Sequence, residues 1–520
     1  MIFGMRFLPV SLFFAALMPL CAAISDPVKT ENGLVSGIPG ADATVRVYKG
    51  IPFAAPPVGN LRWRAPKAAL NWEGTRVAEK FGPICMQRTG GVGGARSDVQ
   101  MSEDCLYLNV YTAASSAKDK RPVMVWIHGG ALTSGAGSVY DGEALAKKGV
   151  VVVTVNYRLG IFGFFAHPEL TKESDRNSSG NYGLLDQIQA LEWVQKNIAA
   201  FGGDLKRVTI FGESAGSWSV NYLTATPLAR GLFQRAIGES GGEFNPARKL
   251  ADMEQAGVKF GEANGAATLA ALRAKSADDL SKVQGFQTAA NVDGWFLPED
   301  VFTIYSKGKQ SDVPTIIGSN NDEGTLFTPP NTTAASFRKL AETRFGKDAD
   351  AFLKLYPFHS DQEAWEVQAE SMRDQTFGWQ MRTWAREQTK TGKSKVYVYY
   401  FSRVPPGPSR VKGAFHGAEI GYVFDNLIIP PWGAGPNEAA RPYTDIDHKL
   451  ADTISSYWIN LAATGDPNGK GLPKWPAYKA KDDQAMALGD KIEVMPVPHK
   501  AQLDFLDEYY EKQRQSPPTP

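Results

Sequence analysis

A serine between two glycines is the pattern in this sequence with the clearest chemical use, and it occurs twice. The motif Gly-x-Ser-x-Gly places Ser214 within residues 212–216 and Ser240 within residues 238–242. Where a strand turns sharply into a helix, this motif lifts the serine hydroxyl above the sheet, and the flanking glycines avoid collisions in the tight turn. A hydroxyl presented in this way can act as the nucleophile of an acyl transfer.

The residues around the two motifs favour Ser214 as the nucleophile. An apolar, β-branched run at 207–211 precedes Ser214, and residues 218–224 can form a helix after it. The second motif runs into two glycines and then Pro246, which stop a helix before it begins. We therefore predict that Ser214 is the nucleophile and that Ser240 is structural or lies behind the site.

A serine nucleophile needs a base, and the sequence contains six histidines. For a serine at such a turn the chain order is serine, acid, histidine, which leaves the four histidines after Ser214. His416 lies in a loop about 15 residues after the apolar run 396–401, where a base would reach the end of the sheet. His359 falls in a loop between predicted helices, and His448 and His499 are expected to be solvated. The sequence predicts His416 as the general base.

The acid should follow a strand between the serine and the histidine. Residues 315–318 form such a strand, and Asp322 and Glu323 come directly after it. Spacing alone does not choose between the two carboxylates. Whichever acts would hold the imidazole in one tautomer and stabilise its protonated form.

Small residues after another strand predict an oxyanion hole. His128, two glycines and Ala131 follow the apolar run 122–127, and small residues let backbone N–H groups approach a substrate oxygen. A further donor is expected at the N–H of Ala215, directly after the nucleophile. His128 is assigned a role in supporting the turn rather than in catalysis.

The segments that must position these residues predict an α/β architecture. Residues 122–127, 150–156 and 207–211 are continuous apolar runs, as in strands buried on both faces, and residues 181–201 have helical spacing. A strand, a helix and a strand in succession imply a parallel sheet. We expect further strands at 315–318 and 396–401 and a late helix at 445–464. The predicted fold is a large, mostly parallel sheet flanked by helices, with loop and helical insertions: the α/β-hydrolase fold.

Composition indicates a globular protein without a global charge. Of the 520 residues, 43% are hydrophobic and 21% charged, and the formal net charge is +1. No overall field is available to hold nucleic acid, so no nucleic-acid partner is expected. There is no repeat and no long linker, which favours a single domain over residues 24–514 followed by a polar, Pro-rich, disordered tail at 515–520.

The first 23 residues have the features of a secretory signal. One positive charge near the start is followed by an apolar run of about 14 residues and then by Ala22 and Ala23. The run is short for a membrane span and contains two prolines. We predict that residues 1–23 are cleaved and that the protein is secreted or periplasmic. Cys85 and Cys105 then remain as an even pair that an oxidising compartment can join, whereas a cytosolic protein would keep them as free thiols.

Together these motifs resemble the type-B carboxylesterase family, which includes cholinesterases and bacterial para-nitrobenzyl esterases. The likeness runs from about residue 30 to residue 476. The segments that carry it are residues 50–63, 102–109, 126–131, 153–163, 181–186, 202–216, 322–324 and 416–419.

The resemblance implies functional roles for individual residues. It selects Glu323 rather than Asp322 as the acid, and it implies a triad of Ser214, Glu323 and His416. The oxyanion donors that it implies are the backbone N–H groups of Gly130, Ala131 and Ala215.

The resemblance also implies the surroundings of this site. Glu213 would line the site beside the nucleophile, and Ser240 would lie behind the triad. A Cys85–Cys105 disulfide is implied, as are two structural ion pairs, Arg62–Glu103 and Arg158–Asp186.

The sequence departs from the family pattern in two places. Ala131 replaces the third glycine of the oxyanion turn, a change that narrows the site. Cholinesterases carry a tryptophan between the two cysteines that holds a quaternary ammonium, but residues 87–96 have none, so choline esters are not expected as preferred substrates. Arg88 and Arg96 in this segment are expected to be solvated, and their alternative role is to meet an acidic substrate.

The predicted function is the hydrolysis of small carboxylic esters through an acyl-enzyme, without a metal or other cofactor. A second hypothesis is a non-catalytic binding module, because members of this family exist that lost the serine. Here the serine, acid and histidine are all present. A peptidase or lipase is a narrower alternative, although no single amphipathic lid is evident for a lipase.

Overall fold

The structure is a computed structural model that describes residues 24–88, 100–283, 285–407, 411–428 and 442–515. The predicted signal peptide (1–23) and residues 516–520 of the predicted tail lie outside the described residues. Gln515, the first residue of that tail, is the last residue of the final helix, α16 (Lys500–Gln515). No helix among the described residues is both long enough and apolar enough to cross a membrane.

The centre of the molecule is a large mixed sheet. Eleven strands of the described residues join it in the order β18-β17-β16-β15-β12-β11-β9-β10-β8-β4-β3. The strands from β10 to β17 are parallel, and β18, β8, β4 and β3 pair antiparallel at the two edges. The bounds of these strands are β3 (Ile38–Pro39), β4 (Arg46–Pro52), β8 (Tyr107–Thr112), β9 (Arg121–Ile127), β10 (Val151–Val155), β11 (Gly203–Glu213), β12 (Arg235–Glu239), β15 (Thr315–Asn320), β16 (Val396–Phe401), β17 (Gln484–Leu488) and β18 (Ile492–Pro496).

The predicted strands and the predicted parallel sheet are confirmed, and the strand bounds differ most at β11. The run predicted at 207–211 is the second half of β11, which begins four residues earlier and shifts register against β9 between Gly203 and Val208. The first half of β11 contains Asp204 and Lys206, which are not fully buried. Polar residues at a sheet end leave no apolar pattern, so the sequence did not reveal them.

The two faces of the sheet pack against different sets of helices. Alternate residues of β9 point to opposite sides: Val125 belongs to one hydrophobic cluster and Trp126 to the other. The first cluster includes side chains of α4 (Tyr182–Asn197), α5 (Ala215–Ala225) and α13 (Trp379–Thr391). The second includes side chains of α1 (Glu143–Lys147), α14 (Ile420–Val423) and α15 (Asp445–Thr464). Burial on both faces explains why the central strands are continuously apolar.

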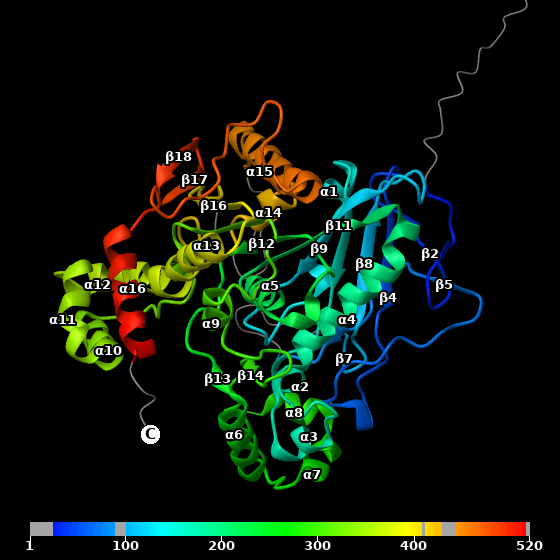
Figure 1. Cartoon of the computed structure of the whole chain (residues 1–520), viewed down its shortest axis with the longest axis horizontal. Helices are drawn as coiled ribbons and strands as arrows, with labels where there is room; N and C mark the ends of the chain where they lie inside the picture. Colours follow the sequence, from blue (N-terminus) through cyan, green and yellow to red (C-terminus); the bar gives the residue numbers. More distant parts are fainter. Residues whose placement is uncertain (1–23, 89–99, 284, 408–410, 429–441, 516–520) are drawn as a thin grey trace, which may run out of the picture.

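Most of the remaining helices form two groups outside the sheet (Figure 1). One group comprises α10 (Ala334–Phe345), α11 (Ala349–Leu355), α12 (Asp361–Arg373) and α16. The other comprises α3 (Pro168–Glu173), α6 (Leu250–Ala263), α7 (Leu269–Ala274) and α8 (Ala277–Lys282). The short helices α2 (Gly160–Phe164) and α9 (Val301–Ser306) lie nearer the sheet. These groups are the helical insertions predicted from the sequence.

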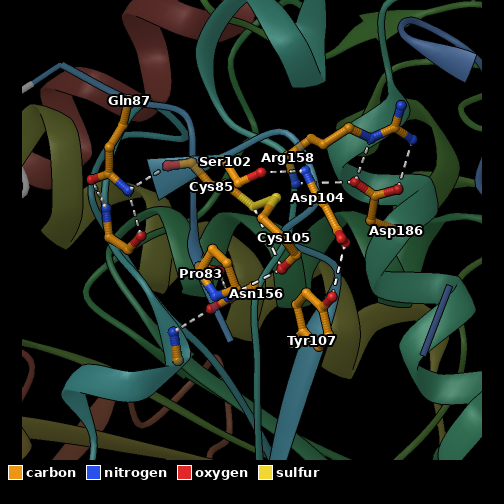
Figure 2. Close-up of a disulfide and its surroundings, with 12 residues drawn as sticks. Pro83, Cys85, Gln87, Ser102, Asp104, Cys105, Tyr107, Asn156, Arg158 and Asp186 are labelled. Carbon is orange, nitrogen blue, oxygen red and sulfur yellow. Dashed lines mark hydrogen bonds and ion pairs between the residues drawn. A yellow bond between two sulfur atoms is a disulfide. The ribbon is translucent and has the colours of Figure 1, made fainter. Parts of the chain in front are cut away.

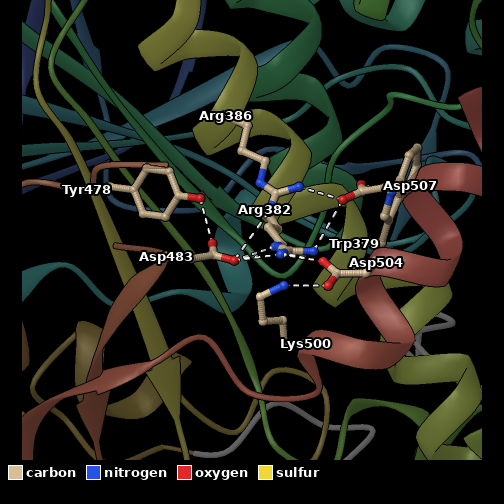
Figure 3. Close-up of polar contacts among 8 residues, drawn as sticks. All are labelled: Trp379, Arg382, Arg386, Tyr478, Asp483, Lys500, Asp504 and Asp507. Atoms are coloured by element: carbon tan, nitrogen blue, oxygen red, sulfur yellow. Dashed lines mark hydrogen bonds and ion pairs between the residues drawn. The ribbon is translucent and has the colours of Figure 1, made fainter. Parts of the chain in front are cut away.

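A charge network centred on the buried Arg382 connects α16 to α13 (Figure 3). The Arg382 side chain, 1% exposed, donates to Asp483 at 2.6 and 2.9 Å, to Asp504 at 2.8 Å and to Asp507 at 3.3 Å. Tyr478 donates its hydroxyl to Asp483 at 2.7 Å. One arginine therefore joins two turns of α16 to the segment that leads into β17.

Candidate active site

Ser214 lies at the sharp turn between β11 and α5. Its φ of 58° and ψ of −123° are an unusual conformation for a residue with a side chain, as the predicted strand-to-helix turn requires. The flanking glycines leave no room for substituents, because a Cβ on Gly212 or Gly216 would lie 2.5 or 2.0 Å from the carbonyl oxygen of Ile127. The Ser214 N–H donates to the carbonyl of Glu239 at 2.8 Å. The hydroxyl-bearing residue remains half-buried at the carboxyl end of the sheet.

Ser240 occupies a similar position one strand away but is completely buried. It follows β12, also has a positive φ (57°), and is not succeeded by a helix. Its hydroxyl donates to Glu419 at 3.3 Å, and its N–H donates to the carbonyl of Gly318 at 2.8 Å. Ser240 is therefore kept away from solvent, whereas Ser214 is only half-buried.

The structure brings His416 and Glu323 into direct contact. His416 Nδ1 lies 2.6 Å from Glu323 Oε2, and both side chains are buried. On the other side of the ring, His416 Nε2 lies 3.2 Å from Oε1 of Glu213, the residue that precedes Ser214. The imidazole is thus held between two carboxylates, with its Nε2 edge directed to the strand end that bears Ser214.

The two acids that spacing left open have different contacts. Glu323 touches the imidazole, whereas Asp322 accepts a hydrogen bond from the Ala414 N–H at 2.7 Å, two residues before His416. Asn320 Nδ2 donates to the carbonyl of Phe415 at 2.9 Å. The end of β15 therefore supplies both the carboxylate for the histidine and the contacts that hold its loop.

Two phenylalanine rings enclose the same imidazole. The Phe377 ring centroid lies 4.6 Å from that of His416, and the Phe327 centroid lies at 5.1 Å with an angle of 61° between the ring planes. Phe377 belongs to a π-helical turn, Asp374–Gly378, between α12 and α13. Phe377 could not be identified from the sequence, since a π-helical turn has no recognisable pattern in a single sequence.

The electrostatics of the site are set by buried carboxyl groups. Burial raises the pKa of Glu213 to about 8 and that of Glu419 to about 7, and it raises the pKa of Glu239 well above its usual value. Burial lowers the pKa of His416, but the nearby Glu213 and Glu323 outweigh it and raise this pKa to about 9. The surroundings thus favour a protonated imidazole, the form that appears during acyl transfer.

Glu239 and Glu419 were not singled out from the sequence. Glu239 is buried and accepts a hydrogen bond from Trp458 Nε1 at 2.7 Å. The available signal for Glu239 was its place in the second serine motif. For Glu419 it was its position three residues after His416. Neither position indicates burial without the fold.

The predicted oxyanion turn follows β9 and lies against the nucleophile. A Cβ built on Gly129 would be only 3.0 Å from the Cβ of Ser214. The Tyr157 hydroxyl donates to the carbonyl of His128 at 2.8 Å, and the two rings stack with centroids 4.4 Å apart. Burial lowers the pKa of His128 to about 4, so this ring is neutral at pH 7, in line with a supporting role. Ala215, the other predicted donor, begins α5.

The disulfide and the two ion pairs implied by the family resemblance are formed in the described residues, and Figure 2 shows the disulfide and the Arg158–Asp186 pair. Cys85 and Cys105 form a disulfide. The ion pairs Arg62–Glu103 and Arg158–Asp186 have closest contacts of 2.5 and 2.7 Å. Arg88 is exposed, whereas Arg96 and the rest of 89–99 lie outside the described residues.

The structure tests the predicted environments of the other late histidines. His359 lies in the loop between α11 and α12, and His448 is exposed, both as expected. The expectation for His499 is wrong: this residue is half-buried, and its Nε2 lies 3.3 Å from the Tyr400 hydroxyl. Packing of the chain after β18 against β16 covers it, a long-range contact that its polar sequence neighbours do not indicate. Within the described chain, no group of three or more His, Cys, Asp or Glu residues is arranged to hold a metal ion.

Comparisons with known proteins agree on one family. The sequence model of the carboxylesterase family matches residues 25–506. Fumonisin B1 esterase of Sphingopyxis macrogoltabida is 37% identical over 497 residues, covering 92% of this chain and 89% of that protein. Para-nitrobenzyl esterase of Bacillus subtilis (strain 168) is 37% identical over 90% of this chain and 95% of its own length. A solved structure of PNB esterase, 35% identical, superimposes with a TM-score of 0.80 over 92% of this chain and 99% of that one.

Proposed function

The chain belongs to the carboxylesterase family and is a carboxylic ester hydrolase, and on that premise we propose that it acts through an acyl-enzyme on Ser214, with His416 as general base and Glu323 orienting it. The observation that carries the assignment is the 2.6 Å contact between His416 Nδ1 and Glu323, with Nε2 directed to the strand end that bears Ser214. The substrate class is a small carboxylic ester.

Acylation follows from this arrangement. His416 Nε2 accepts the proton of the Ser214 hydroxyl as its oxygen attacks the ester carbonyl carbon. The carbonyl oxygen becomes an oxyanion, for which the N–H groups of Gly130, Ala131 and Ala215 are the proposed donors. When the tetrahedral intermediate collapses, the bond to the alcohol oxygen breaks. The imidazolium of His416 gives its proton to the departing alcohol, and the acyl group stays on Ser214.

Deacylation repeats these steps with water. His416 accepts a proton from a water molecule that attacks the acyl carbon, and the same donors face the second oxyanion. Collapse of this intermediate releases the carboxylic acid and returns the proton to the Ser214 oxygen. The oxyanion hole, the base and the nucleophile are therefore used twice in each turnover.

The carboxylates on either side of His416 have distinct proposed roles. Glu323 accepts the Nδ1–H, which leaves the lone pair of neutral His416 on Nε2, the atom that must take the serine proton. Glu213, when ionised, favours the imidazolium but not the neutral ring. Glu323 and Glu213 together would stabilise the imidazolium that forms during acyl transfer. They would also reduce the fraction of free enzyme in which His416 is neutral and able to accept a proton.

Covalent labelling tests the nucleophile. A fluorophosphonate probe is expected to modify one site in the folded protein, and peptide mapping should place it on Ser214. Ser214→Ala should abolish labelling and lower kcat for para-nitrophenyl butyrate by about 10⁴-fold or more. Ser306→Ala, at the exposed end of α9, is the matched control and should behave like wild type. Labelling at Ser240, or equal turnover by wild type and Ser214→Ala, would refute the proposal.

The location of the protein is proposed on separate grounds. Residues 1–23 have the pattern of a cleaved signal, and the Cys85–Cys105 disulfide is typical of an oxidising compartment. We infer export and removal of this segment, which leaves residues 24–514 as one catalytic domain. N-terminal sequencing of the protein from its native host should give a first residue near Ile24, and a mature protein that retains Met1 would contradict this.

A further inference from the structure

The proposed oxyanion turn has a conformation that its neighbours must enforce. Gly130, Ala131 and Leu132 are three successive residues with positive φ, at 103°, 55° and 59°. Two of them carry side chains, and such backbone conformations persist only where the surrounding structure determines them. Whatever holds this turn therefore also determines where the N–H groups of Gly130 and Ala131 point.

After this turn the chain folds back against it through residues 135–137, which form the return segment. Gly135, with a φ of 112°, lies so close to the start of the turn that a Cβ there would be 2.4 Å from His128 Nδ1 and 2.7 Å from the carbonyl oxygen of Gly129. Gly129 in turn lies against Ser214, so a displacement of Gly135 would be transmitted to the nucleophile side of the turn.

One buried carboxamide holds Gly135 at both of its backbone polar groups. Gln87, 5% exposed, accepts the Gly135 N–H on Oε1 at 2.9 Å and donates from Nε2 to the Gly135 carbonyl at 2.9 Å. The same Nε2 donates to the carbonyl of Cys85 at 3.0 Å. Figure 2 shows the Gln87 side chain reaching from the disulfide region to this backbone.

A second buried carboxamide holds the return segment two residues later. Asn156 accepts the Gly137 N–H on Oδ1 at 2.9 Å. Its Nδ2 donates to the carbonyl of Cys105 at 3.1 Å and to that of Pro83 at 3.2 Å. Each amide side chain thus binds the return segment on one side and the carbonyl of a disulfide cysteine on the other.

We propose that Gln87 is a positioning residue for the oxyanion hole, with Asn156 as its counterpart, and that together they tie the oxyanion turn to the Cys85–Cys105 disulfide. Loss of Gln87 would release Gly135, let the turn relax toward ordinary backbone angles, and turn the N–H groups of Gly130 and Ala131 away from the oxyanion. This inference rests on the proposed function, because it explains how the donors of that site are held.

Gln87→Met is the principal test, since methionine keeps the approximate volume and removes all three hydrogen bonds. For para-nitrophenyl butyrate we expect kcat to fall by about 10–100-fold while KM changes by about twofold or less, because a small displacement of transition-state donors is costly. Affinity for a trifluoromethyl ketone should fall by the same factor, since its tetrahedral adduct places an oxyanion at these donors. A purely structural role would lower Tm without this parallel loss.

Two further variants make the test independent of folding defects. Gln195→Ala is the matched control: this glutamine also donates to two backbone carbonyls, those of Leu205 and Leu232, but lies at the end of α4. It is expected to lower Tm and leave kcat and inhibitor affinity unchanged. Asn156→Ala removes the contacts that join the same return segment to Cys105, so it should also lower kcat and inhibitor affinity in parallel. It replaces Gln87→Met as the test if Gln87→Met does not fold.

The outcomes separate this inference from the proposed function. If wild type is labelled on Ser214 and a folded Gln87→Met (or Asn156→Ala) keeps kcat and inhibitor affinity within about twofold of wild type, the positioning role is refuted and the proposed function stands. If the probe does not label Ser214 in the wild type, the proposed function fails first. A parallel loss of kcat and inhibitor affinity confined to Gln87→Met and Asn156→Ala supports the inference.

Discussion

At the scale of single residues, two carboxylates raise the pKa of His416, but only Glu323 is proposed to fix its tautomer. Glu323 contacts Nδ1 at 2.6 Å and Glu213 lies 3.2 Å from Nε2. Only the first contact fixes which nitrogen carries the lone pair, whereas both favour the charged ring. Substitution of each acid by its amide should therefore change different kinetic quantities.

Glu323→Gln should lower kcat through the tautomer of His416. The amide can donate a hydrogen bond to Nδ1, which would place the imidazole proton on Nε2, where it cannot accept from Ser214. We expect kcat for para-nitrophenyl butyrate to fall by about 10³–10⁴-fold with little change in Tm. Asp322→Asn, which alters the neighbouring carboxylate, should lower kcat by a smaller factor. A Glu323→Gln enzyme within tenfold of wild type would contradict the role of Glu323.

Glu213→Gln should shift the pH dependence. The base must be neutral in the free enzyme, so kcat/KM rises with pH through the pKa of His416, which the carboxylates raise to about 9. Removal of the Glu213 charge lowers this pKa, so the rising limb of kcat/KM should move to lower pH. The pH profile of both enzymes measures this. An unchanged limb, or one moved to higher pH, would contradict the electrostatic role of Glu213.

At the scale of elements, the sequence predicted the strands and helices whose hydrophobic pattern is contained in neighbouring residues. The apolar run 396–401 and the helical pattern 445–464 match β16 and α15 in full, because continuous burial and 3.6-residue periodicity leave a direct trace. The predicted helix 181–201 is α4 followed by a 3₁₀ turn, Ile198–Phe201, that ends at Gly202 with a φ of 82°. The π-helical turn that contains Phe377 was not predictable, since the extra residue of such a turn depends on tertiary packing.

The attachment of α16 to α13 is an element-level feature that can be tested for stability. Arg382→Met would remove the cation shared by three aspartates and leave the buried Asp483 with fewer partners. We expect a loss of about 3–5 kcal/mol in the free energy of unfolding.

Lys395→Ala is the control for this substitution, because it breaks an exposed pair with Asp466 whose lysine side chain is 61% exposed. It should cost less than about 1 kcal/mol. Chemical denaturation measures both variants. An equal cost would show that the network does not fasten α16.

At the scale of the whole molecule, buried proton-binding groups should make stability depend on pH. Burial raises the pKa of Glu213 to about 8 and of Glu243 to about 7, from an ordinary value of 4.5, and the carboxylates raise that of His416 to about 9 from 6.5. Above pH 4.5 the folded state therefore holds protons that the unfolded chain has released. The contribution of His416 is fully present below pH 6.5 and is lost as pH rises to about 9.

The free energy of unfolding should accordingly be greater at pH 6 than at pH 9. We expect a difference of at least about 2 kcal/mol, measured by urea denaturation at fixed ionic strength. Glu213→Gln should reduce this difference, because it removes one of the responsible groups. A stability that is constant or rises over this interval would contradict the assigned pKa shifts.

Contacts between residues far apart in the chain explain which features of the site the sequence could not predict. Chain order and motifs predicted Ser214 and His416 as nucleophile and base, but the choice of Glu323 over Asp322 came from a family resemblance, and the different contacts of the two acids appear only in the fold. His499 was misjudged because β16 covers it, and Gln87 and Glu239 were missed because their partners lie 48 and 219 residues away. Long-range burial determines the environment of these polar residues, and local sequence carries little trace of it.

A crystal structure of the protein after reaction with a para-nitrophenyl phosphonate would test the central claim most directly. The account predicts phosphorus bonded to the oxygen of Ser214, His416 Nε2 within hydrogen-bond distance of that oxygen, and the phosphoryl oxygen facing the N–H groups of Gly130, Ala131 and Ala215. Phosphorus on another side chain, or another histidine beside the Ser214 oxygen, would contradict it.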